Sequence, residues 1–87
     1  MITQLENICI NQGFETLPAK NGKNSLIVVR KGKKHVLTII ENEERIIVRS
    51  EKEGDDFFES CDKNDIERKS DLLHILNEQL KTLKTDS

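Results

Sequence analysis

Three apolar segments separated by two short polar connections constrain the fold of this chain most strongly. The segments run Ser25–Lys31, His35–Glu41 and Arg45–Glu51, and they are rich in Val and Ile, which favour β-strands. The connections between them, at residues 31–34 and 41–44, are short enough for tight hairpin turns. The sequence therefore predicts an antiparallel meander of three strands.

The alternation of side chains along these strands predicts which residues share a face. If both connections are two-residue turns, Val28 lies opposite Leu37 and Leu37 lies opposite Val48. The core face then comprises Leu26, Val28, Leu37, Ile39, Ile46 and Val48.

The second face of the predicted sheet is also largely apolar, which is unusual for a meander with one solvated side. One interpretation is that a helix covers each face. The other is that the second face binds a partner or a second copy, because exposed apolar patches mark interfaces. The candidate residues for that surface are Ile27, Val29, Val36, Ile47, Arg45 and Arg49.

A short helix is predicted at the N-terminus, over about residues 4–12. Thr3 and Glu6 have the spacing of a capping box, in which each side chain accepts a hydrogen bond from a backbone N–H at the helix start. Gly13 supplies a residue that tolerates positive φ, and Phe14 is placed for the hydrophobic contact that often follows such a helix end.

A longer helix is predicted near the C-terminus, over about residues 65–84. Asn64 and Glu67 form a second potential capping box, and residues 85–87 should fray. Its apolar stripe favours packing on the sheet over a coiled-coil dimer, and we expect Leu73, Leu76 and Leu80 in the core. The stripe is formed by Ile66, Leu73, Leu76, Leu80 and Leu83, widened by Leu72 and Ile75.

Two segments complete the predicted fold. Residues 14–18 could form an edge strand, since Pro18 is tolerated only at a sheet edge, and Phe57, Phe58 and Cys61 suggest a short helical segment. With 87 residues, of which 34% are hydrophobic, the chain can bury one small core. We therefore predict a single α+β domain over residues 1–87 in α-β-β-β-α order, with three strands, or four if residues 14–18 contribute one.

Charge is unevenly distributed along the sequence although the formal net charge is only −2. Residues 20–35 carry six basic side chains and no acidic one, so they could contact phosphates or an acidic partner, or form a solvated turn. The basic patch comprises Lys20, Lys23, Arg30, Lys31, Lys33 and Lys34.

Catalytic and metal-binding patterns are lacking in the sequence. His35 and His74 have no ligand spacing with Cys9 or Cys61, so we expect no metal, no cofactor and no enzymatic activity. Two cysteines do not make a disulfide framework, and we interpret Cys9 as a buried residue and Cys61 as a surface or half-buried thiol. The absence of a leader or a long apolar run predicts a cytoplasmic protein that does not enter a membrane.

Two resemblances bear on function. The element order with a basic first hairpin is similar to the double-stranded-RNA-binding fold, which implies phosphate contacts by lysines at the start of the last helix; here Lys63, Arg68 and Lys69 are interspersed with acidic residues. The size and layout also resemble small phage-encoded inhibitors such as anti-CRISPR proteins. We expect a non-enzymatic bacterial or phage protein that binds another protein, or itself as a homodimer, and inhibits a host system. Nucleic-acid binding through the basic hairpin is the alternative.

Overall fold

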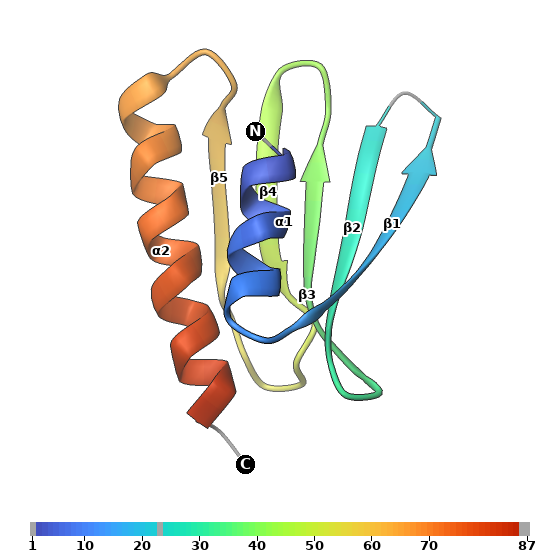
Figure 1. Cartoon of the computed structure of the whole chain (residues 1–87). Coiled ribbons are helices and arrows are strands. Elements are labelled where there is room, and N and C mark those ends of the chain that lie inside the picture. Colours follow the sequence, from blue (N-terminus) through green and yellow to red (C-terminus); the bar gives the residue numbers. More distant parts are fainter. Residues whose placement is uncertain (1, 23, 86–87) are drawn as a thin grey trace.

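The computed structural model describes residues 2–22 and 24–85 and shows an α+β fold, as predicted (Figure 1). Five antiparallel strands form one open sheet whose spatial order is the chain order. The elements are α1 (Ile2–Asn11), β1 (Glu15–Asn21), β2 (Asn24–Lys31), β3 (Lys34–Glu41), β4 (Arg45–Ser50), β5 (Phe58–Asp62) and α2 (Ile66–Thr85).

The sheet has more strands than the three or four predicted. The segment after α1 does form an edge strand, and it contains Pro18. The prediction of a helical segment around Phe58 and Cys61 is wrong, because these residues belong to β5 and pair with Arg49 and Ile46 of β4. Their spacing suits a helix as well as a strand, and pairing with β4 supplies the backbone hydrogen bonds that decide between the two.

Both helices lie on the same face of the sheet (Figure 1). α1 packs against β1, β2 and β3, whereas α2 packs against α1 and β5. A single core fills the space between the helices and the sheet. It consists of Leu5, Cys9, Phe14, Ile27, Val29, Val36, Leu37, Ile39, Ile46, Val48, Cys61, Leu72, Leu76, Leu80 and Leu83.

An irregularity between β2 and β3 determines which side of β2 faces this core. Val29 pairs with Leu37, but the next residue, Arg30, pairs with His35, so Val36 is an extra residue in β3. Such a bulge shifts the register by one residue, and a one-residue shift moves a strand's side chains to the opposite face. The carbonyl of Val36 accepts a hydrogen bond from the backbone N–H of Glu51 at 2.9 Å.

The bulge overturns the predicted faces of β2. Ile27 and Val29 point into the core, and Leu26 and Val28 point away from it. β3 and β4 keep their predicted core faces, because their register differs from the prediction by two residues, with Ile39 opposite Val48. Three residues assigned to the second face, Ile27, Val29 and Val36, are therefore buried core residues.

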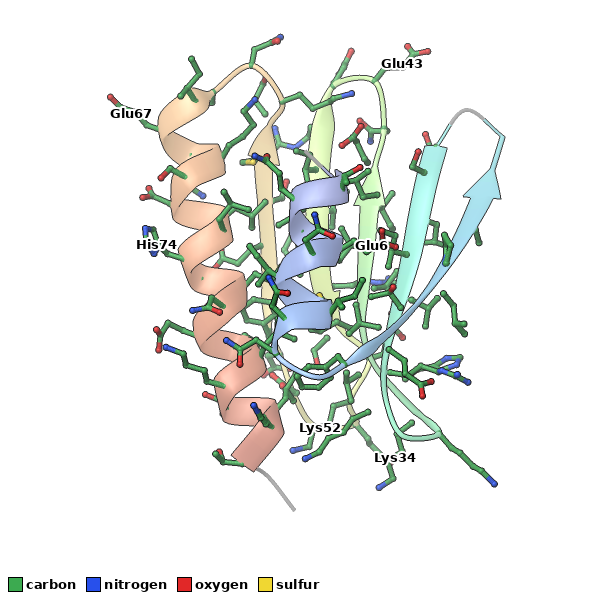
Figure 2. All side chains as sticks on the ribbon, viewed as in Figure 1. Glu6, Lys34, Glu43, Lys52, Glu67 and His74 are labelled. Atoms are coloured by element: carbon green, nitrogen blue, oxygen red, sulfur yellow. The ribbon has the colours of Figure 1, made fainter. Side chains whose placement is uncertain are left out.

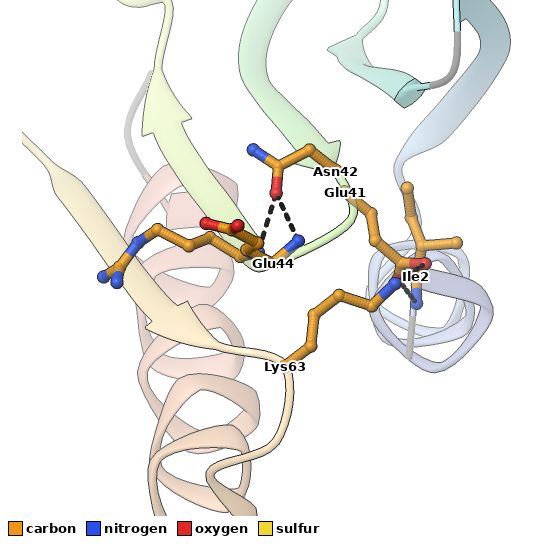
Figure 3. Close-up of polar contacts among 6 residues, drawn as sticks. Ile2, Glu41, Asn42, Glu44 and Lys63 are labelled. Carbon is orange, nitrogen blue, oxygen red and sulfur yellow. Dashed lines mark hydrogen bonds and ion pairs between the residues drawn. The ribbon is translucent and has the colours of Figure 1, made fainter.

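The start of α1 is stabilised from outside the helix. α1 begins at Ile2, so Thr3 lies within its first turn and the predicted capping box is wrong. Instead, the backbone N–H of Ile2 donates to Glu41 Oε2 at 3.0 Å, and Lys63 Nζ lies 3.4 Å from Glu41 Oε1 (Figure 3). A carboxylate is favourable at this position because a helix N-terminus carries partial positive charge.

The end of α1 follows the prediction. Gly13 has a φ of +91°, and the N–H of Phe14 donates to the carbonyl of Cys9 at 3.0 Å. The Phe14 side chain is buried, so it supplies the predicted hydrophobic contact at the helix end.

α2 begins one residue later than predicted and has a different cap. Asp65 Oδ1 accepts the N–H of Arg68 at 3.1 Å, so Asp65 is the N-cap residue and Asn64 is not. α2 packs on the core, as predicted, although Ile66 is 78% exposed and Leu73 is only half-buried. α2 extends to Thr85, and the remainder of the predicted frayed end, residues 86–87, lies outside the described residues. The buried stripe of α2 is Leu72, Leu76, Leu80 and Leu83.

Candidate interaction surface

The face of the sheet opposite the helices, here called the open sheet face, carries two cross-strand rows of side chains. Neither helix of the described chain covers it (Figure 1). The first row consists of Ala19, Leu26, Ile40, Ile47 and Ser60. The second row consists of Leu17, Val28, Thr38, Arg49 and Phe58.

Apolar side chains dominate both rows. Phe58 is 60% exposed and Leu17 is 42% exposed, at opposite edges of the sheet. Between them, the Leu, Val and Ile side chains of β2, β3 and β4 are half-buried by their neighbours within the sheet. The result is a broad, shallow apolar surface, of the kind that marks interaction sites.

The polar groups on the open sheet face are held by contacts within the chain. The Thr38 hydroxyl donates to Glu51 Oε1 at 2.9 Å, and Arg49 Nε lies 3.0 Å from the same oxygen. Arg45 donates to Ser60 Oγ from Nε at 2.9 Å and from Nη2 at 2.8 Å. Arg49 thus lies within the second row, paired with Glu51, and Arg45 lies beside the first row, bound to Ser60.

The sequence-predicted surface and the observed one overlap only partly. Ile47, Arg45 and Arg49 lie on the open sheet face. Leu17, Leu26, Val28 and Phe58 also lie on this face, although the sequence pattern did not predict it. No alternation of apolar and polar residues marks β5 in the sequence, because Phe58 shares its face with Ser60 and Cys61 shares the other with Glu59. Its exposed Phe is therefore placed only by the pairing with β4.

The basic residues of the sequence do not gather in one patch. Lys31, Lys33 and Lys34 lie at the β2–β3 turn, whereas Lys20 lies near the end of β1 that is far from this turn. Lys23 lies outside the described residues.

The other basic residues considered from the sequence are separated from that turn or already paired. Arg30 Nη2 forms an ion pair with Glu15 at 2.7 Å. The basic residues at the start of α2, Lys63, Arg68 and Lys69, lie at the opposite end of the molecule from the β2–β3 turn (Figure 1). The two basic groups expected from the RNA-binding layout therefore do not form a continuous surface.

A cavity of about 450 Å³ lies beside the β2–β3 turn. Lys34 and Lys52 extend at this end of the molecule (Figure 2), but Glu51 and Glu53 also line the cavity. Lys31 Nζ, another lining group, donates to the carbonyl of Leu83 at 2.7 Å and so caps the end of α2. The cavity is thus lined by both basic and acidic side chains, and one of the lysines, Lys31, is bound to the end of α2.

The two thiols belong to the core. Burial, together with nearby Glu6, raises the pKa of Cys9 to about 12. Cys61 is also buried, which corrects the expectation of a surface or half-buried thiol, and burial raises its pKa. Since a thiolate is the reactive form of cysteine, neither environment favours a nucleophile.

Other site types find no support in the described part of the chain. Within it, no three His, Cys, Asp or Glu side chains are grouped so that they could hold a metal ion. Across residues 2–22 and 24–85, neither helix combines the length and apolar character that a transmembrane span requires.

Comparisons of the chain with protein-family models, with curated proteins and with solved structures return no match. The function therefore has to be inferred from the geometry of the surface.

Proposed function

We propose that this chain is a non-enzymatic protein-binding domain that acts through the open sheet face. The observation that carries the proposal is the placement of both helices on one side of a sheet whose other side is also apolar. If the partner is a larger host protein, the chain would inhibit it by occupying its surface, which needs contact area and no catalytic group.

The edges of the sheet are less suited to binding than its face. β1 is one edge strand, and its central residue Pro18 has no N–H to donate to an added strand. β5, the other edge, has only five residues and lies against α2. Binding through side chains of the open sheet face is therefore favoured over strand addition.

Site-specific photo-crosslinking tests the proposal with a matched control. A benzophenone amino acid replaces Phe58 on the open sheet face or Ile66 at the start of α2, which are both large, exposed apolar residues. The variants are expressed in the cell of origin and irradiated, and the adducts are identified by mass spectrometry.

We expect one defined polypeptide to be crosslinked from position 58 and not from position 66. Adding Ile47→Lys should remove that adduct, because a charge would be desolvated at the centre of the contact. Identical adducts from both positions, or none from position 58, would contradict the proposal.

A further inference from the structure

The central strand β3 joins two turns of opposite charge. It is preceded by a turn with Lys31, Lys33 and Lys34 and followed by one with Glu43 and Glu44. Lys34 and Glu43 accordingly lie at opposite ends of the molecule (Figure 2). Lys33, Lys34, Glu43 and Glu44 are all exposed. The open sheet face thus has a basic turn at one end of its midline and an acidic turn at the other.

Two symmetric ways of packing this face against itself differ in how they place the turns. In a face-to-face dimer the two-fold axis lies in the plane between the sheets. An axis parallel to the strands places each turn against the like-charged turn of the other copy. An axis perpendicular to the strands places the basic turn of each copy against the acidic turn of the other.

We propose that the occupant of the open sheet face is a second copy of this chain, related by a two-fold axis perpendicular to the strands. This inference rests on the proposed function and names its partner. The perpendicular axis superimposes each strand on its counterpart and places the first row of one copy over the second row of the other. Complementary charges then meet at both ends, which sets the orientation of the two copies.

The size of the face agrees with a reversible dimer. Five strands about 4.8 Å apart, each contributing some six residues at about 3.3 Å, span roughly 500 Å² per copy. Two copies would bury roughly 1,000 Å², which is near the lower limit for a specific interface. The dimer should therefore depend on protein concentration.

Charge-swapped variants test both the occupant and its orientation. One variant carries Glu43→Lys and Glu44→Lys, and the other carries Lys33→Glu and Lys34→Glu. Sedimentation equilibrium measures the dissociation constants of the wild type, of each variant and of their equimolar mixture. Circular dichroism verifies that each variant is folded.

The wild type should dimerise, and each variant alone should dimerise more weakly by roughly tenfold, because like charges then meet at both ends. The mixture should recover the affinity of the wild type, since each swapped turn then faces a complementary one. Ile47→Lys should give a monomer.

Three other outcomes would overturn the axis, the homodimer or its location on this face, and each can be told apart from a failure of the proposed function. If each variant dimerised like the wild type and the mixture dimerised more tightly, the axis would be parallel to the strands and the orientation would be wrong. A wild type that stays monomeric at near-millimolar concentration would overturn the homodimer, and a crosslink from position 58 to a different protein would still support the proposed function. A dimer that survives Ile47→Lys would lie on another surface and would overturn the inferred dimer, whereas the crosslink from position 58 would still decide the proposed function.

Discussion

The bulge at Val36 makes two adjacent valines energetically unequal, and alanine substitution should reveal the difference. Val29 is fully buried against the helices, whereas Val28 is half-buried on the open sheet face. Val29→Ala removes two methyl groups, worth about 0.8 kcal/mol each in lost burial. The residual cavity adds to this, at roughly 24 cal/mol per Å³. The free energy of unfolding should therefore fall by about 2–3 kcal/mol for Val29→Ala and by less than about 1 kcal/mol for Val28→Ala.

Thermal unfolding followed by circular dichroism measures the two variants under identical conditions. For a domain of this size, each kcal/mol lowers Tm by about 4–8 °C, so Val29→Ala should lower Tm by roughly 10–20 °C. Protein at low micromolar concentration keeps self-association from contributing. Equal losses, or a larger loss for Val28→Ala, would show that β2 faces the core through Leu26 and Val28 and would refute the bulged register.

Three further predictions concern the helix ends and the core thiol. Glu41→Gln should lower the free energy of unfolding, measured by urea titration, by about 1 kcal/mol, because it weakens the contact that caps α1. Thr3→Ala should lower it by less. A larger loss for Thr3→Ala than for Glu41→Gln would support the capping box instead. Lys31→Met should lower stability by roughly 0.5–1 kcal/mol through loss of the cap on α2, and Lys33→Met should leave it unchanged; equal effects would contradict the cap. The pKa of the Cys9 thiol is about 12 in the folded protein and 9.0 in the unfolded chain. The thiol therefore adds its full contribution to the free energy of unfolding below pH 9, and this contribution declines above pH 9. Between those pH values the free energy of unfolding should fall by up to about 1.4 kcal/mol per pH unit more for the wild type than for Cys9→Ala. Parallel profiles of unfolding free energy against pH for the two proteins would contradict this assignment.

Local signals in the sequence predicted the fold class and several element boundaries. The stop at Gly13 and Phe14 depends on a few neighbouring residues, and so do the hairpin turns of the meander. The cap of α1 could not be found this way, because Glu41 lies 39 residues from the N–H that it accepts.

The faces of β2 illustrate a different limit. Leu26, Ile27, Val28 and Val29 form an unbroken apolar run, so a one-residue shift changes no hydrophobic pattern and leaves no trace in the sequence. The candidate surface inherited this error at Ile27 and Val29. Ile47 escaped it, because the register of β3 and β4 differs from the prediction by two residues and an even shift keeps each side chain on its face.

The chain-order arrangement of the strands also has a consequence for how the protein folds during synthesis. Each strand pairs with the next one along the chain, so every hairpin closes a short loop as it leaves the ribosome, and such local contacts favour rapid folding. α1 is the exception, because it is made first but packs against α2, which is made last; Gln12 Nε2, for example, donates to Asn77 Oδ1 across 65 residues. The nascent meander therefore exposes the future core beside α1 until the last helix emerges, and completion of α2 is the step that closes the domain.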